Sequence, residues 1–358
     1  MPVVNVRKGD DICRYAVIMV IVLISCSGCM APAEPAPGPE KPDLVQNDPA
    51  RQLAEQYPAP GDLVVVNGSV MHIRCQGTGS PVVILEAGST DCSLSWARVQ
   101  PAVSRFTTVC SYDRAGYGWS EPQEGALTAR AVTSRLHQLL SRANISPPYI
   151  LAGHSLGGEY ARAYAHWYPD EVAGLVLVDP GSEWQMVRTG EKFTREQKAA
   201  TAAAVRMIRD DQELAENGTF VRNLTRVPVD PRLPHDEFMA YRALLATRPS
   251  FWEARAVEGE SAFSIFEELQ RENITDLGDI PLIVISSGNE MGFSPDPQQN
   301  AEANRIFRML QEETARQSSS GQYLMAPETS HYVQLDRPDM VISAVRTVFN
   351  ESRERIGG

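Results

Sequence analysis

Short apolar runs alternate along most of the chain with segments whose apolar residues recur at helical spacing. Residues 81–88, 148–153, 172–180 and 280–288 are apolar on both faces, which is typical of strands buried within a parallel sheet. Residues 106–113 and 322–327 are predicted to be two further short strands. Ahead of them, β-branched residues at 62–77 surround an Asn-Gly pair, which favours a tight hairpin turn.

The segments between the strands have helical periodicity. In residues 127–144, for example, Val132, Leu136 and Leu140 fall on one helical face. Helices are also predicted for residues 156–170, about 298–316 and about 338–352. Short buried strands that alternate with helices predict an α/β protein with a mostly parallel, doubly wound sheet.

One long segment interrupts this alternation. Residues 182–279 have no strong strand pattern and several helical stretches, so they are predicted to be a helical cap inserted into the core. The core is then expected in two parts, residues 51–181 and residues 280–358. The cap's large apolar side chains either line a pocket or form the cap's own core; they are Trp184, Met186, Phe238, Met239, Tyr241, Phe251 and Trp252.

The N-terminus has the composition of a secretory signal. Arg7, Lys8 and Arg14 precede an apolar run at residues 15–25. Because this run is shorter than the roughly 20 residues that span a bilayer, residues 1–25 are predicted to be a cleaved signal peptide. The alternative is an uncleaved transmembrane anchor, since weakly polar residues extend the run to Ala31.

The stretch LISC, residues 23–26, resembles the box at which bacterial lipoprotein signals are cleaved before a cysteine. The resemblance implies that Cys26 is lipidated and that the exported protein is anchored to a membrane of the cell envelope. Prolines alternate with small and acidic residues after it, so residues 26–50 are expected to be an extended linker.

Charge and cysteine content narrow the function classes. The formal net charge of −12 argues against a nucleic-acid-binding surface. The cysteines do not have the spacing of a metal site. Cys75, Cys92 and Cys110 are expected to be buried free thiols, although an exported location would permit a disulfide.

The sequence LAGHSLGGEY, residues 151–160, carries the strongest chemical signal. Its Gly-x-Ser-x-Gly pattern lies between a predicted strand and a predicted helix, which is the context of a nucleophile elbow. A sharp turn there presents the Ser155 oxygen at the carboxyl edge of the sheet, while Gly153 and Gly157 let strand and helix approach closely. The N–H of Leu156, at the helix start, then points to where an oxyanion would form.

Two further loops are expected at the same edge. The stretch EAGST, residues 86–90, ends a strand, and the Ser89 N–H is the second expected oxyanion donor. His331 lies in a loop before the last predicted helix and is the expected general base for Ser155. The other histidines are expected to be core or surface residues.

With LEAG, YDRAGYGWS, GHSLGG and LVLVD, the chain resembles the esterase-like branch of the α/β-hydrolases over about residues 60–352. The resemblance implies an α/β-hydrolase fold and hydrolysis of a small carboxylic ester through an acyl-serine intermediate, without metal or cofactor. The chain departs from the common His-Gly form by having Ala87-Gly88. Glu86 is expected to brace this loop by accepting backbone N–H bonds.

The acid of the triad stays open among three carboxylates. The family usually takes it from the loop after residues 280–288, which holds Glu290 and Asp296, but the common Gly-x-x-Asp pattern is absent there. Some relatives, certain haloalkane dehalogenases among them, take it from the strand end where Asp179 lies. We favour Asp179, with Glu290 as the alternative, and expect Asp113 to be structural by bonding its own turn.

Other functions are compatible with these motifs because a fold does not fix chemistry. They are hydrolysis of a carbon–carbon bond or an amide, acyl transfer, and a non-catalytic surface lipoprotein that keeps the hydrolase fold. A serine nucleophile argues against dehalogenase and epoxide-hydrolase chemistry, for which this fold uses an aspartate.

Overall fold

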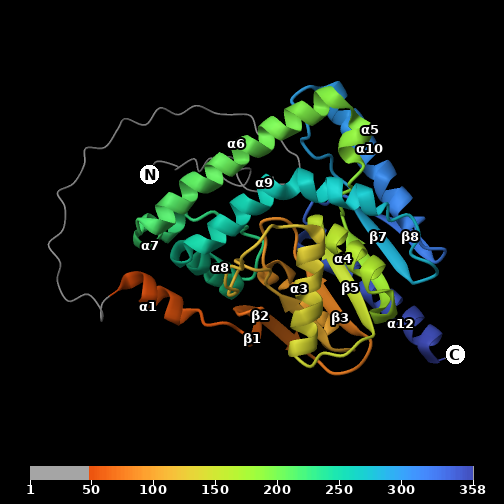
Figure 1. The fold of residues 1–358 in the computed structure, drawn as a ribbon, viewed down its shortest axis with the longest axis horizontal. Helices are drawn as coiled ribbons and strands as arrows, with labels where there is room; N and C mark the ends of the chain where they lie inside the picture. The colour runs from red at the N-terminus through yellow and green to blue at the C-terminus, as the bar shows by residue number, and fades with distance from the viewer. Residues whose placement is uncertain (1–47, 358) are drawn as a thin grey trace, which may run out of the picture.

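The computed structural model describes residues 48–357 and centres on one sheet of eight strands (Figure 1). The strand order is β1-β2-β4-β3-β5-β6-β7-β8; β2 is antiparallel to both neighbours, and all other pairs are parallel. The predicted α/β class and mostly parallel sheet are confirmed. The strands are β1 (Asp62–Val66), β2 (Ser69–Gln76), β3 (Val82–Glu86), β4 (Val109–Tyr112), β5 (Tyr149–His154), β6 (Val172–Val178), β7 (Leu282–Ser287) and β8 (Gly321–Ala326).

Helices follow most of the strands and cover both faces of the sheet. Among the described residues, no helix combines the length and apolar character needed to cross a bilayer. The predicted signal peptide, Cys26 and most of the predicted linker lie outside the described residues. The helices are α1 (Pro49–Gln56), α2 (Gln100–Val103), α3 (Ala129–Arg142), α4 (Leu156–Trp167), α5 (Gln185–Thr189), α6 (Glu191–Glu216), α7 (Thr219–Arg222), α8 (His235–Thr247), α9 (Pro249–Glu272), α10 (Pro297–Ala315), α11 (Val333–Asp336) and α12 (Pro338–Gly357).

Side chains of the central strands divide between two apolar cores, one on each face of the sheet. Ile84 of β3 packs in the core shared with α3 and α4, whereas its neighbours Val83 and Leu85 pack in the core shared with α12. Successive side chains of a strand point to opposite faces, so a strand covered on both sides is apolar at every position. This is the physical reason for the continuous apolar runs in the sequence.

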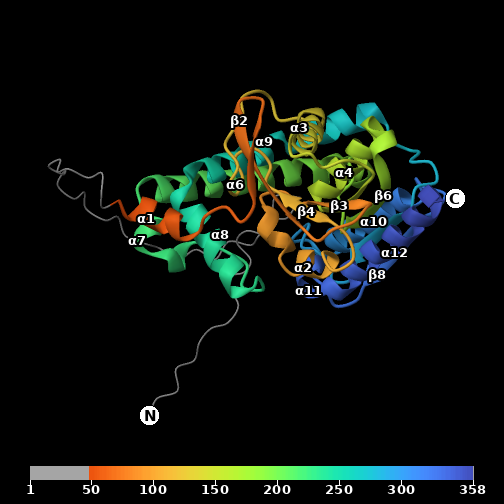
Figure 2. The same cartoon turned by 90° about the horizontal axis from the view of Figure 1, so that it is seen from below.

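A helical insert, residues 182–279, lies between β6 and β7 and contains α5 to α9. The long helices α6 and α9 run side by side (Figure 1), and Figure 2 shows α7 and α8 toward the end of the molecule away from β6 and α12. Phe238, Tyr241, Phe251 and Trp252 pack in one apolar cluster together with residues outside the insert, among them Leu94, Tyr117, Trp119 and Leu335. These aromatic side chains are therefore part of an apolar core, as one of the two expectations had it, but the insert shares that core with the rest of the protein.

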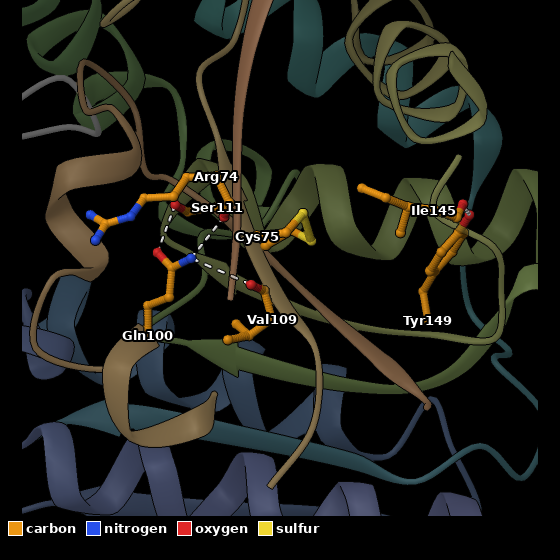
Figure 3. The surroundings of a disulfide bond; sticks show 8 residues. Arg74, Cys75, Gln100, Val109, Ser111, Ile145 and Tyr149 are labelled. Carbon is orange, nitrogen blue, oxygen red and sulfur yellow. Dashed lines mark hydrogen bonds between the residues drawn. A yellow bond between two sulfur atoms is a disulfide. The ribbon is translucent and has the colours of Figure 1, made fainter. Parts of the chain in front are cut away.

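Cys75 in β2 and Cys110 in β4 face each other in antiparallel register and form a disulfide (Figure 3). The expectation of free thiols was wrong for this pair, whereas Cys92 is a buried free thiol as predicted. The error has a physical origin: β2 pairs with β4 rather than with β3, the next strand along the chain, and no local pattern specifies that pairing. Gln100 supports the same strands, since its Nε2 donates to the carbonyl oxygen of Arg74 (2.8 Å).

Candidate active site

Ser155 occupies the turn between β5 and α4 with φ 55° and ψ −124°. A positive φ is costly for a residue that carries a Cβ. The flanking glycines allow the turn to be this tight, because a Cβ on Gly153 would lie 2.3 Å from the carbonyl oxygen of Gly157. The N–H of Ser155 donates to the carbonyl oxygen of Val178 (3.0 Å), which fixes the turn against the end of β6.

Three of the predicted site residues form a continuous line of hydrogen bonds. Ser155 Oγ lies 2.9 Å from His331 Nε2, and His331 Nδ1 lies 2.7 Å from Asp179 Oδ2. They come from the β5–α4 turn, the loop between β8 and α11, and the end of β6. Parallel strands present their carboxyl ends at one edge of the sheet, and this brings together residues that are far apart in the sequence.

Asp179 is held for this contact by its other oxygen. Oδ1 accepts hydrogen bonds from the N–H of Ser287 (2.9 Å) and from Nε2 of Gln311 (3.0 Å), while Oδ2 faces His331. Burial raises the pKa of Asp179, but the hydrogen bonds that it accepts, above all the one from His331, outweigh burial and hold the pKa below its ordinary value. An ionised Asp179 favours the tautomer with hydrogen on His331 Nδ1, so that Nε2 is free to accept a proton.

The other two candidate acids lie elsewhere. Glu290 is exposed in the loop after β7. Asp296 is also exposed and caps α10, where its carboxylate accepts the N–H of Gln298 (2.9 Å). The structure therefore places Asp179 beside the imidazole of His331. Of the alternative acids, Glu290 is an exposed loop residue and Asp296 is a helix cap.

The loop that follows β3, residues 87–90, lies directly against the Ser155 turn; we refer to it as the β3 loop. A Cβ on Gly88 would lie 2.6 Å from His154 Nδ1 and 3.3 Å from Ser155 Cβ. On the other side, α4 begins at Leu156, and the first N–H groups of a helix have no partner within the helix. Ser155 is thus flanked by the two backbone segments that contain the expected donors, Ser89 and Leu156.

Glu86 and Asp113 were both expected to have structural roles; the predicted contacts of Glu86 are wrong, whereas the predicted contact of Asp113 is present. Glu86 does not brace the β3 loop through backbone N–H groups as predicted; it accepts hydrogen bonds from the hydroxyl of Tyr112 and from the guanidinium of Arg114 (2.8 Å). The reason is that β4 lies beside β3 and places these side chains at the same sheet edge. Asp113 makes the predicted bond within its own turn, to the N–H of Trp119 (3.0 Å).

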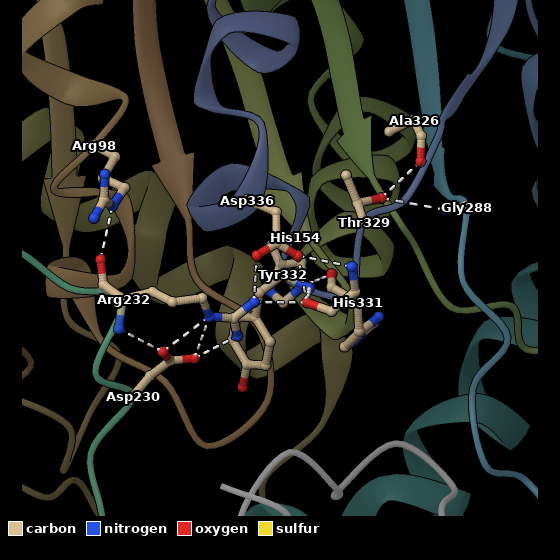
Figure 4. A network of polar contacts seen from close by, with 11 residues as sticks. Arg98, His154, Asp230, Arg232, Gly288, Ala326, Thr329, His331, Tyr332 and Asp336 are labelled. Carbon is tan, nitrogen blue, oxygen red and sulfur yellow. Dashed lines mark hydrogen bonds and ion pairs between the residues drawn. The ribbon is translucent and has the colours of Figure 1, made fainter. Parts of the chain in front are cut away.

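Arg232, from the helical insert, fastens the loop that carries His331 (Figure 4). Its guanidinium donates to Ser330 Oγ (2.7 Å) and to Asp336 (2.6 Å), and Asp336 accepts the N–H of Ser330 (2.7 Å). His154 contacts the same loop, since its Nε2 lies 2.9 Å from the carbonyl oxygen of His331. The sequence gives no signal for Arg232, because its salt bridge to Asp336, about 100 residues away, depends on the tertiary fold.

Other histidines have structural partners. His72 is buried 2.8 Å from Asp113, and His137 lies 3.2 Å from Glu171. Within residues 48–357, His, Cys, Asp and Glu side chains do not form any group of three or more that could hold a metal ion.

Curated relatives match the chain over different lengths. The uncharacterized protein C23C11.06c of Schizosaccharomyces pombe is 36% identical over 97 residues, and the probable transporter efuK of Hormonema carpetanum is 34% identical over 114 residues. These matches cover 27% and 31% of this chain but only 18% and 16% of those proteins. The uncharacterized protein YqjL of Bacillus subtilis is 22% identical over 285 residues, which are 79% of this chain and 90% of YqjL.

Solved structures share the fold over most of the chain. A putative acyltransferase from Salmonella enterica has a TM-score of 0.62 at 18% identity and covers 81% of this chain and 94% of its own. A thermophilic esterase from Thermogutta terrifontis has a TM-score of 0.54 at 20% identity, covering 81% of this chain and 97% of its own. These identities show the fold alone. The profile of the alpha/beta hydrolase family matches residues 63–344, which is most of the sequence, and the chain therefore belongs to the alpha/beta hydrolase family.

Proposed function

We propose that this protein is a serine hydrolase that cleaves carboxylic esters through an acyl-serine intermediate. The observation that carries the proposal is the line of hydrogen bonds from Asp179 through His331 to Ser155. A nucleophile, a base and an orienting acid are the three roles that acyl transfer by serine requires. Membership of the alpha/beta hydrolase family supports the same chemistry.

In the first half-reaction, Ser155 Oγ attacks the carbonyl carbon of the ester while His331 Nε2 takes its proton. The negative charge that develops on the carbonyl oxygen is stabilised by the N–H groups of Ser89 and Leu156. The tetrahedral intermediate then collapses: the bond to the alcohol oxygen breaks, and His331 returns the proton to the leaving alcohol. Asp179 stabilises the imidazolium formed in between.

In the second half-reaction, water attacks the acyl-serine and His331 again accepts and returns a proton. The products are the carboxylic acid and free Ser155. An acyltransferase would pass through the same acyl-serine and differ only in the acceptor, with an alcohol or amine replacing water. Analysis of the acyl product in the presence of an added alcohol therefore separates hydrolysis from transfer.

The test uses the full-length protein in detergent with a fluorophosphonate probe and p-nitrophenyl esters of two to about twelve carbons. The wild type is expected to be labelled and to turn over. Ser155→Ala should lose labelling and about 10⁴-fold or more in kcat, and Asp179→Asn should lose on the order of 10³- to 10⁴-fold. Esters of different length also show which acyl chain the site accepts.

Glu290→Gln is the matched control, since it removes the alternative acid. It should behave like the wild type because Glu290 is exposed and the imidazole is bonded to Asp179 instead. A collapse of activity in Glu290→Gln with an active Asp179→Asn would reassign the acid. A folded wild type that is neither labelled nor active would favour the non-catalytic surface lipoprotein.

We further propose that the enzyme is an exported lipoprotein anchored through Cys26. The proposal rests on the LISC box after the apolar run. The Cys75–Cys110 disulfide supports it, because disulfides persist in oxidising compartments outside the cytoplasm.

A further inference from the structure

Glu258, in helix α9 of the insert, reaches into the β3 loop. Its side chain is fully buried. One of its oxygens accepts hydrogen bonds from Ser89 Oγ (2.8 Å), from the N–H of Thr90 (2.9 Å) and from the hydroxyl of Tyr117 (2.9 Å). The two loop donors come from Ser89 itself and from the residue that follows it.

Arg114 binds carbonyl groups of the same loop. Its guanidinium donates to the carbonyl oxygens of Ala87 (2.6 Å) and Gly88 (2.8 Å), and it forms an ion pair with Glu258 (3.0 Å). Glu86 is its second ion-pair partner (2.8 Å). A buried carboxylate and a buried guanidinium, which are paired with each other, thus bind successive peptide groups of the loop.

The loop conformation itself needs such support. Thr90 has a φ of 64°, which a residue with a branched Cβ adopts only under constraint. The Ser89 N–H belongs to the same peptide group as the Gly88 carbonyl, which Arg114 binds, and the next peptide group carries the Thr90 N–H, which Glu258 binds. The direction of the Ser89 N–H therefore depends on both contacts. A Cβ on Gly88 would lie 3.3 Å from Ser155 Cβ, so the glycine lets the loop approach the Ser155 turn closely.

We infer that Glu258 is a positioning residue for the proposed ester hydrolysis: it orients the Ser89 N–H toward the oxyanion and makes helix α9 part of that apparatus. The inference rests on the proposed function. Glu258 does not touch the substrate, so it acts only through the β3 loop. Because an oxyanion donor stabilises the transition state more than the bound ester, the loss of Glu258 is expected to change kcat rather than KM.

The test compares Glu258→Gln with Glu260→Gln, a control on the same helix whose side chain is about half exposed and pairs with Arg209. Glutamine keeps the size of Glu258 but removes the charge that pairs with Arg114. Burst titration of Ser155 with a p-nitrophenyl ester counts the active enzyme, so a loss of folded protein does not enter kcat. We expect kcat per titrated site to fall about 10- to 100-fold in Glu258→Gln with KM unchanged, because displacing a donor costs less than deleting one.

A second readout is the affinity for an alkyl boronic acid, which forms a tetrahedral adduct with the serine. Its Kd should rise by the same factor as kcat/KM falls, as for a transition-state analogue. A purely structural role would lower the titrated fraction and leave this affinity unchanged, and that result would overturn the inference.

Ser89→Ala is the second variant in case Glu258→Gln does not fold, since it removes only the hydroxyl bond to Glu258 and keeps the backbone N–H. It should lower kcat and boronate affinity together, by a smaller factor. If Glu258→Gln does not fold, wild-type values in Ser89→Ala would overturn the inference. In that case an active wild type leaves the proposed function standing, whereas an inactive folded wild type removes both.

Discussion

His154, the residue before the proposed nucleophile Ser155, binds the backbone of His331, the proposed general base, and stays uncharged beside it. Its Nε2 must carry a hydrogen in order to donate to the carbonyl oxygen of His331. Burial, followed by repulsion from His331, lowers its pKa to about 3. His154 is therefore neutral when His331 becomes an imidazolium, and a second positive charge beside it is avoided.

This depressed pKa predicts a pH dependence of stability. Below pH 6.5 the unfolded chain protonates His154, whereas the folded protein does not until about pH 3. The stabilisation that His154 gives is thus fully present above pH 6.5 and is lost as the pH falls toward 3. In His154→Gln, which keeps an N–H donor but does not titrate, the decline in unfolding free energy over this range should be smaller by on the order of 4 kcal/mol.

Urea unfolding at a series of pH values measures the difference. The exposed His235 provides the control, and His235→Gln should follow the wild type. Parallel curves for wild type and His154→Gln would contradict the prediction, because His154 would then titrate alike in both states.

At the residue scale, the sequence supports some parts of the site and is silent on others. Ser155 could be predicted because its strand, turn and helix are contiguous in the sequence. His331 could be predicted because in this fold the histidine follows the serine and the acid along the chain. Asp179 competes with Glu290 in the sequence because both follow strands of the same sheet. Glu258 has no distinguishing signal: in the sequence it is one of several charges in a helix, and only the packing of α9 onto the sheet edge brings it to Ser89.

At the scale of elements, the strength of the local pattern decides what can be predicted. The β1–β2 hairpin and the buried strands appear where expected, since turn chemistry and apolar runs are local properties. The strand predicted for residues 106–113 is shorter, and β4 starts only at Val109. Strand neighbours are not local properties, which is why the pairing of β2 with β4, and with it the disulfide, could not be predicted.

The disulfide gives a prediction for these two strands. It joins residues 35 apart, and closing a loop of that length in the unfolded chain stabilises the fold by about 4 kcal/mol on the chain-entropy estimate. Reduction with dithiothreitol should therefore lower the Tm, and the double variant Cys75→Ser/Cys110→Ser should have the same lowered Tm with or without the reductant. Calorimetry of both proteins is the measurement; a reductant-dependent Tm in the double variant would show that another cause is at work.

At the scale of the whole molecule, charged side chains of the insert bind two loops of the core at the candidate site. Glu258 of α9 binds the β3 loop, and Arg232, between α7 and α8, binds the loop of His331. The two loops that flank Ser155 are thus each tied to the insert by a charged side chain. The insert's aromatic residues also share one apolar cluster with Leu94, Tyr117 and Leu335, so apolar packing joins the insert to the rest of the protein alongside these two charged contacts.

The proposed lipid anchor at Cys26 leads to a further prediction: loss of the lipid should leave the catalytic activity unchanged. In bacteria fed an alkyne-tagged fatty acid, the wild type should incorporate the tag and Cys26→Ser should not, while the neighbouring Cys29→Ser should be labelled normally. The values of kcat and KM for a soluble ester should be equal in all three, because Ser155, Asp179 and His331 lie far from residue 26 in the sequence and are bound to one another within residues 48–357. Tag that persists in Cys26→Ser, or an untagged wild type whose mass still includes residues 1–25, would contradict the lipoprotein proposal and favour the transmembrane anchor.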